Sequence, residues 1–293
     1  MRKFVLLVFI SFFCCVSCAG AQEKEKKEIK VSDILKAIKK GEPVLITGKI
    51  IMDDLDFTQQ ANAIGLNGGA LQVEISSNIF FNDCVFIGKV TANNVVKSVP
   101  VQTVFRNNLV FLNCDFRNEV NFDNAVVFGT VNFSKSIFRG KTSFNNLSVW
   151  AKDSYFSEIE AEQPFSMIYS LFNGNVSFMN ATFLGGFSFQ ETTVRGKLLF
   201  NNAVFAQRAD FDMIEVAGRA FFNYAEFQDS AGFMQSRFLN SVEFVNTTFK
   251  NGTNFEKTYI GYDIKTDGLE SEIPVDFSNA FFVKKQNIYN HEE

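Results

Sequence analysis

The sequence predicts an all-β solenoid of short strands, and three observations carry that prediction. A phenylalanine returns every eleven residues from Phe178 to Phe255. Positions two apart within each row are small or apolar, which places them on the same face of a strand. The seventh position of most rows is glycine or asparagine, which accept a positive φ at low cost. A short fixed period is typical of chains that stack units rather than fold around one compact core.

An eleven-residue period also occurs in right-handed coiled coils, so a helical interpretation has to be weighed. At about 100° per residue, the phenylalanine and the large residue five positions later lie about 140° apart and cannot share a helix face. The glycine, asparagine, threonine and valine of each row also disfavour a helix. Both points favour strands.

Residues 1–18 have the features of an export signal. Arg2 and Lys3 form a positive start, and the apolar run Phe4–Val16 is too short for an ordinary membrane-spanning helix. The leader carries two of the 28 basic residues and none of the 32 acidic ones, so its removal leaves a net charge near −6. An acidic balance argues against a nucleic-acid partner, because phosphate binding needs a concentrated basic face.

The end of the leader leaves two processing routes open. Residues 15–18 resemble a bacterial lipoprotein box with Cys18 as the lipid-attachment residue, although Cys15 stands where that motif usually has leucine. Residues 19–21 fit ordinary cleavage between small residues instead. We expect an exported protein of the cell envelope, at the periplasmic or outer-membrane face, anchored to the membrane through Cys18.

The folded part is expected to begin after a charged tether, residues 19–30, which can bury little apolar surface. Ile34, Leu35 and Ile38 then have helical spacing behind Ser32, a possible N-cap. This short helix is expected to cap the first coil, with partner binding as the alternative. Residues 31–80 should hold the helix and irregular first coils.

The regular repeat is expected over residues 81–283, with insertions at 91–110 and 261–274 and a polar tail at 284–293. The first insertion contains Pro100 and several valines, which favours a projecting loop or hairpin. The second should replace part of a coil with a surface loop. Near Trp150 the register slips by one residue.

Two segments show the finer unit of the repeat. Residues 131–141 read VNFSK then SIFRGK, and residues 242–252 read VEFVN then TTFKNG. Over roughly residues 81–282 the chain resembles the pentapeptide-repeat family, in the variant that alternates five- and six-residue units. The resemblance implies a right-handed quadrilateral β-helix, with two rows per coil and each central phenylalanine pointing inward.

Few residues offer chemistry. The only histidine, His291, lies in the tail, so the sequence predicts no catalytic triad, metal site or cofactor. Asp53 and Asp54 are interpreted as turn residues rather than an acid–base pair. Cys84 and Cys114 occupy the small inward position and are interpreted as buried thiols, with a disulfide as the alternative.

The function that follows is a non-enzymatic binding or scaffold module whose partner is an unidentified protein or envelope component. Association between copies through the solenoid ends is a further option. One alternative is a DNA mimic that binds type II topoisomerases, as some members of the resembled family do. The export signal argues against it, as do basic residues in the turns: Arg117, Arg139, Arg208 and Lys250. A polysaccharide-binding protein would need an exposed aromatic or acidic row, and none is evident. Arg195, Lys197 and Arg219 predict a small basic corner.

Overall fold

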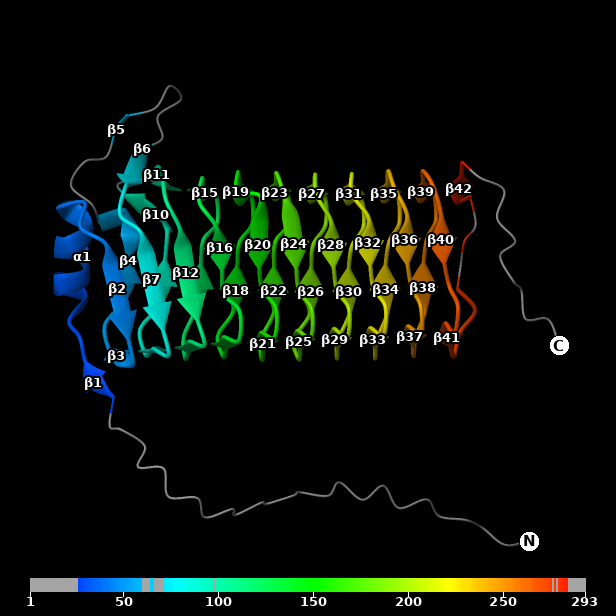
Figure 1. The fold of residues 1–293 in the computed structure, drawn as a ribbon, viewed down its shortest axis with the longest axis horizontal. Helices are drawn as coiled ribbons and strands as arrows, with labels where there is room; N and C mark the ends of the chain where they lie inside the picture. Colours follow the sequence, from blue (N-terminus) through cyan, green and yellow to red (C-terminus); the bar gives the residue numbers. More distant parts are fainter. Residues whose placement is uncertain are drawn as a thin grey trace, which may run out of the picture.

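Four β-sheets wind around a common core to form a straight solenoid of stacked coils (Figure 1). The computed structural model describes residues 26–59, 64–65, 71–96, 98–275, 277 and 279–283. We name the sheets A to D, and the chain visits them in the order B, A, C, D within each coil. The sheets hold between 9 and 12 strands, so at about 4.8 Å per coil the rod is about 50 Å long.

The strands of sheets A and B are short and parallel. Sheet A contains β1 (Lys27–Glu28), β3 (Lys49–Ile51), β8 (Val85–Phe86), β13 (Asp115–Phe116), β17 (Ile137–Phe138), β21 (Glu160–Ala161), β25 (Thr182–Phe183), β29 (Val204–Phe205), β33 (Glu226–Phe227), β37 (Thr248–Phe249) and β41 (Glu270–Ser271). Sheet B contains β2 (Val44–Thr47), β7 (Ile79–Asn82), β12 (Leu109–Leu112), β16 (Val131–Asn132), β20 (Asp153–Tyr155), β24 (Asn175–Ser177), β28 (Leu198–Leu199), β32 (Ala220–Phe221), β36 (Val242–Glu243) and β40 (Ile264–Lys265).

Sheets C and D complete the four sides, and sheet D also includes two antiparallel pairings near its beginning. Sheet C contains β4 (Leu55–Asp56), β9 (Val90–Thr91), β14 (Val120–Asn121), β18 (Thr142–Ser143), β22 (Phe165–Ser166), β26 (Phe187–Ser188), β30 (Ala209–Asp210), β34 (Ala231–Gly232) and β38 (Thr253–Asn254). Sheet D contains β5 (Ile64–Gly65), β6 (Leu71–Ile75), β10 (Asn93–Val96), β11 (Val99–Phe105), β15 (Val126–Val127), β19 (Ser148–Val149), β23 (Leu171–Phe172), β27 (Thr193–Val194), β31 (Glu215–Val216), β35 (Arg237–Phe238), β39 (Tyr259–Ile260) and β42 (Phe281–Phe282).

One regular coil takes 22 residues, which is two of the eleven-residue rows. Leu198 pairs with Ala220, and Ala220 pairs with Val242, each one coil further along. Backbone hydrogen bonds join the coils at every side, for example from Phe200 N to Phe221 O at 2.7 Å. The prediction of an all-β solenoid with two rows per coil is therefore confirmed.

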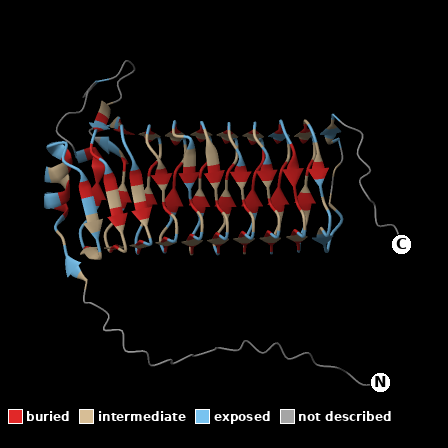
Figure 2. Cartoon of the chain, in the orientation of Figure 1, coloured by how far each residue is buried: buried red, intermediate tan, exposed pale blue. Residues whose placement is uncertain are grey.

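The core consists of phenylalanine ladders that run along the rod. Figure 2 shows buried residues recurring on the strands of successive coils. Because a coil contains two rows, the eleven-residue series divides into two ladders. In one, Phe178 and Phe200 stack with ring centroids 4.7 Å apart and planes 2° apart. In the other, Phe211 and Phe233 stack at 5.0 Å and 3°.

The two ladders meet edge to face inside the solenoid. The rings of Phe211 and Phe222 lie 5.4 Å apart with planes at 87°. A third ladder comes from the fifth position of alternate rows, where Phe205 and Phe227 stack at 4.7 Å. Burial of each ring contributes about 1.5–3 kcal/mol, and edge-to-face pairs add about 0.5–1.5 kcal/mol.

The positive-φ position differs from the expectation. Glycines at the seventh position, such as Gly196, do not have a positive φ, whereas the residue two after the central phenylalanine does in nearly every row. Asn202 has φ 56° and Met213 has φ 58°. Ala203 N donates to Phe200 O at 3.0 Å across this turn. The φ sign matches the third residue of a type II turn, which explains the frequent asparagine there.

The seventh-position glycines are required for a different reason, which is the close approach of the backbone in the preceding coil. A Cβ on Gly196 would lie 2.4 Å from the carbonyl carbon of Gly174. The corresponding contact of Gly218 is also 2.4 Å, to the oxygen of Gly196. A bend does recur at this position, but steric room rather than φ selects glycine there.

A single helix caps the N-terminal end of the rod, as expected (Figure 1). Helix α1 (Val31–Lys39) buries Val31, Ile34 and Ile38 against the first coil. Its N-cap is Lys30 without a side-chain cap hydrogen bond, so the expected Ser32 cap is wrong. A short 3₁₀ helix, η1 (Phe57–Gln59), follows in the first coil.

The segment 91–110 forms a hairpin and then rejoins the solenoid. Strands β10 and β11 pair antiparallel, and the second half of β11 takes its place in sheet D between β6 and β15. Phe105 is fully buried in the core. Phe81 pairs with Phe111 across 30 residues, which is eight more than a regular coil, so only the hairpin is extra.

Of the two later irregularities, the slip near Trp150 has the expected size and the segment 261–274 is more regular than expected. The slip near Trp150 is one extra residue at the corner before β20, where Val131 pairs with Ser154. Residues 261–274 are not a surface loop, because β40 and β41 continue sheets B and A. Gly268 supplies the positive φ of the turn, at 67°.

Replacing Phe211 by aspartate tests the ladder. Phe211→Asp removes a fully buried ring and leaves an unpaired charge between two stacked neighbours, so unfolding should become easier by at least about 4 kcal/mol. Met213→Asp is the control, since this side chain is 42% exposed and aspartate tolerates a positive φ. Urea titrations should separate the two variants. Equal stability of Phe211→Asp and wild type would contradict the fold.

Glycine-to-alanine substitutions test the close approach. Gly196→Ala forces a Cβ into backbone and should cost about 1–3 kcal/mol. Gly252→Ala meets no atom within 4 Å and should be neutral or stabilising by up to about 1 kcal/mol. Thermal melting of both variants measures the difference, and an unperturbed Gly196→Ala protein would show that the coils do not approach as described.

Candidate functional site

The chemistry-bearing residues do not gather into a catalytic or metal-binding group in the described part of the chain. No cluster of three or more histidine, cysteine, aspartate or glutamate side chains that could hold a metal ion is present there. His291 and Cys18 lie outside the described residues. Within those residues, no helix is long and apolar enough to cross a membrane.

A polar hollow of about 300 Å³ lies at the base of the hairpin, bordered by Asp54, Asp56 and Glu119. The Asp56 carboxylate accepts hydrogen bonds from Thr58 Oγ1 at 2.6 Å and Asn94 Nδ2 at 3.1 Å. Asp54 accepts from the backbone N–H of Lys89 at 2.7 Å. Asp56 therefore holds the hairpin by a hydrogen bond and Asp54 holds the adjoining turn, which agrees with the turn role expected for Asp54.

A second hollow, of about 220 Å³, lies on sheet C where Gly232 presents no side chain. Burial, and then the neighbouring charge of Asp210, raise the pKa of Asp212. Asp212 Oδ1 accepts from the N–H of Met234 at 2.7 Å, and Asp210 pairs with Arg208 at 3.0 Å. The Asp212 carboxylate therefore accepts a hydrogen bond from the backbone, and the neighbouring Asp210 forms a salt bridge with Arg208.

The most distinctive surface is the corner between sheets D and B, which we call the D–B edge. It comprises the corner segments 106–108, 128–130, 150–152, 173–175, 195–197 and 217–219 of six successive coils. These segments contain five basic residues and no acidic residue: Arg106, Lys152, Arg195, Lys197 and Arg219.

Two exposed aromatic rings lie between the basic residues. Phe128 is 43% exposed and Trp150 is 46% exposed, and their rings stack with centroids 6.4 Å apart. The Arg106 guanidinium lies over the Phe128 ring, 4.9 Å from its centroid. The extra residue after Trp150 adds one residue to the corner segment that contains Lys152.

Most of these cations have no acidic partner. Of the five, only Arg106 forms a salt bridge within the described residues, with Glu74. Arg195 donates to Asn173 Oδ1 at 3.0 Å, an uncharged acceptor. Although burial opposes the shift, hydrogen bonds from Lys265 and Asn223, and then the charges of Lys265 and Arg219, lower the pKa of Glu243. Lys152, Lys197 and Arg219 are exposed and form no salt bridge with any described carboxylate. Their charge is thus available to an external group.

The opposite corner, between sheets A and C, shows the contrast. There Arg117 and Arg139 both pair with Asp115, at 3.2 and 2.8 Å, and Lys250 pairs with Glu226. Arg208 pairs with Asp210. Four cations of this corner therefore take part in salt bridges, whereas exposed Lys141 forms none with any described carboxylate. The two corners differ in how many of their cations are paired, although they have the same backbone geometry.

Sequence reasoning found part of the D–B edge and missed the rest. Arg195, Lys197 and Arg219 lie on one corner, as predicted. The aromatic row formed by Phe128 and Trp150 was not recognised. The sequence feature that could have revealed this row is the 22-residue spacing of Arg106, Phe128 and Trp150. The extra residue after Trp150 interrupts that spacing.

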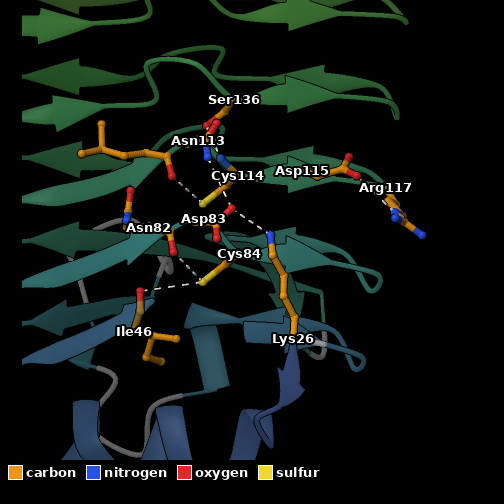
Figure 3. A network of polar contacts seen from close by, with 11 residues as sticks. Lys26, Ile46, Asn82, Asp83, Cys84, Asn113, Cys114, Asp115, Arg117 and Ser136 are labelled. Carbon is orange, nitrogen blue, oxygen red and sulfur yellow. Dashed lines mark hydrogen bonds and ion pairs between the residues drawn. The ribbon is translucent and has the colours of Figure 1, made fainter. Parts of the chain in front are cut away.

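Cys84 and Cys114 lie in the interior, in the inward position predicted for them. Both thiols are free and buried in successive coils, and Cys114 N donates to Ser136 Oγ of the next coil at 3.0 Å (Figure 3). This column is separate from the D–B edge.

Comparison with known proteins agrees with the repeat. The family model described as pentapeptide repeats (9 copies) matches residues 101–147. None of the curated proteins and none of the solved structures matches the chain. The matched segment runs from β11 to the turn before β19, and the same coils continue without a break to β42. The chain is a pentapeptide-repeat β-solenoid.

Proposed function

We propose that this solenoid is a non-enzymatic binding module of the cell envelope, held at the membrane through a lipid on Cys18, which presents the D–B edge to an anionic partner. The unpaired cations of the edge carry the proposal. They stand out on a chain whose net charge is −4 and whose opposite corner holds most of its cations, Arg139 and Arg208 among them, in salt bridges.

The geometry of the rod makes the edge a linear binding surface. Corner residues of successive coils repeat at about 4.8 Å, so the six segments span about 24 Å. Lys197 and Arg219 are exposed neighbours one coil apart. A partner with anionic groups along a line can meet several of these cations together, and such contacts accelerate association and weaken with salt.

The lipid anchor would join the rod at its capped end. Strand β1 begins at Lys27 beside that end, and residues 19–26 separate it from Cys18. A polar spacer of this length holds the rod close to the membrane and leaves its sides accessible. A lipid anchor combined with an open side is the arrangement expected of a scaffold.

Binding of an anionic envelope polysaccharide is the second candidate, and the exposed pair Phe128 and Trp150 favours it. Sugar rings usually stack on aromatic faces, but the Phe128 ring already contacts the Arg106 guanidinium and the Trp150 ring. Contact would therefore involve ring edges and cations. The DNA-mimic alternative gains no support from a basic edge.

Lipid anchoring is tested by metabolic lipid labelling and membrane fractionation of wild type and Cys18→Ser. Wild type should incorporate label and sediment with membranes, and Cys18→Ser should lose both properties. Cys14→Ser, which lies outside the box formed by residues 15–18, is the matched control and should retain both. A Cys18→Ser protein that keeps label and membrane association would rule out this anchor.

The binding surface is tested by neutralising four cations at each corner. Lys152, Arg195, Lys197 and Arg219 are changed to glutamine in one variant. Arg117, Arg139, Arg208 and Lys250 are changed to glutamine in the other. Retention on immobilised envelope extract and on an anionic-glycan array is measured for both, with melting curves as a folding control.

The D–B variant should bind at least about tenfold more weakly, and added salt should weaken wild-type binding. The A–C control should bind almost as well as wild type because its cations are already paired. Retention on the glycan array would identify a polysaccharide partner. Equal binding by both folded variants would exclude the D–B edge.

A further inference from the structure

Cys84 and Cys114 face the same interior position in two successive coils (Figure 3). Asp115 N donates to Cys84 O at 2.9 Å, which fixes the two residues one ladder step apart. The flanking rings confirm the alignment, since Phe81 and Phe111 stack at 5.1 Å and Phe86 and Phe116 stack at 4.9 Å. The two thiols are therefore direct neighbours.

This spacing permits a disulfide, but the disulfide would have a strained geometry. Neighbouring parallel strands hold equivalent Cα atoms about 4.8 Å apart, within the range of disulfides. Side chains that point the same way also have Cβ atoms about 4.8 Å apart, whereas a disulfide prefers about 3.8 Å. The coils must draw together slightly for the bond to form, and a strained disulfide is readily reduced.

The surroundings of the two sulfurs differ. The neighbouring Cys114 side chain, followed by backbone groups and the charge of Lys26, lowers the pKa of Cys84. The Cys114 thiol itself donates to Leu112 O at 3.3 Å. Burial raises the pKa of Cys114. Lys26 is held near the pair by Asp83, at 2.9 Å. Cys84 is the better nucleophile, and Cys114 lies where its thiol can attack the Cys84 sulfur once that sulfur is oxidised.

Access to the pair is controlled by the first coil. Cys84 Sγ lies 3.7 Å from Ile46 O in β2 and 3.3 Å from Asn82 O. The first coil has a complete coil on one side and only helix α1 and the two-residue strand β1 on the other, so it should open more readily than the middle of the rod. Such opening would admit a small oxidant to a thiol that is otherwise buried.

We propose that Cys84 and Cys114 form a reversible redox site that a hydroperoxide oxidises to a disulfide. The Cys84 thiolate attacks a peroxide oxygen, forms a sulfenic acid and releases hydroxide, which becomes water on taking up a proton. Cys114 then attacks the Cys84 sulfur and displaces the hydroxyl, which leaves as water with the Cys114 proton. Two thiols and one hydrogen peroxide thus give one disulfide and two waters, and a thiol reductant reverses the change.

The bond would fasten the second coil to the third and close a loop that contains the β10–β11 hairpin. The Cys84–Cys114 loop also carries Arg106, at the beginning of the D–B edge. Oxidation would therefore stabilise the end of the rod nearest the tether by limiting the opening of its coils. This inference does not depend on the proposed partner.

The test treats the folded full-length chain with hydrogen peroxide, then denatures it, alkylates free thiols and maps tryptic peptides by mass. Cys84 lies in peptide Ile50–Lys89 and Cys114 in peptide Asn107–Arg117. Wild type should yield these two peptides joined, about 2 Da lighter than their summed masses, and dithiothreitol should separate them. Oxidised wild type should also melt at a higher temperature than the reduced protein.

Two variants assign the roles of the cysteines. Serine already occupies the next position of this column at Ser136, so Cys84→Ser and Cys114→Ser should fold. With peroxide and dimedone, Cys114→Ser should be labelled at Cys84 at least about tenfold more than Cys84→Ser is labelled at Cys114. The proposal is overturned if wild type retains both free thiols, if the cysteines join different molecules, or if the labelling of the two variants is equal.

Discussion

The distance between stacked coils is the constraint from which the rest of this structure follows. Backbone pairing fixes this distance at about 4.8 Å, which also lies within the range of centroid separations that favour stacked phenylalanine rings. Phe200 can therefore stack under Phe222 while Phe200 N bonds to Phe221 O. Because the same spacing serves hydrogen bonds and rings, one residue type can fill the core along the whole rod.

That spacing also separates the inward positions from the variable ones. Inward side chains are limited to rings, aliphatic groups and small residues, since each must pack on its equivalent in the next coil. Corner residues point to solvent and are free to differ between coils. On the A–C corner they form salt bridges such as Arg139 with Asp115, whereas on the D–B edge Lys197 and Arg219 have no acidic partner within the described residues. Any specificity in binding should therefore come from the corners.

The fold could be predicted from the sequence because phenylalanine recurs at the same position in almost every row, while the residues around it differ from row to row. The positive-φ position was misassigned because glycine marks both a positive φ and a close backbone approach, and Gly196 is required for the second reason alone. The D–B edge was found only in part, since the extra residue after Trp150 breaks the spacing that would connect Arg106 to Arg195. The two corners differ in how many charges are paired across coils. This pairing depends on where individual side chains lie, which the eleven-residue repeat does not determine.

Hydrogen exchange along the chain tests most directly the claim that stacked coils hold the rod together. Each middle coil is bonded on both sides, whereas a terminal coil is bonded on one, so amide protection should rise from β2 to the coils around Phe200 and fall again toward β42. Exchange that is as fast around Phe200 as in β42 would contradict a solenoid stabilised by coil-to-coil stacking.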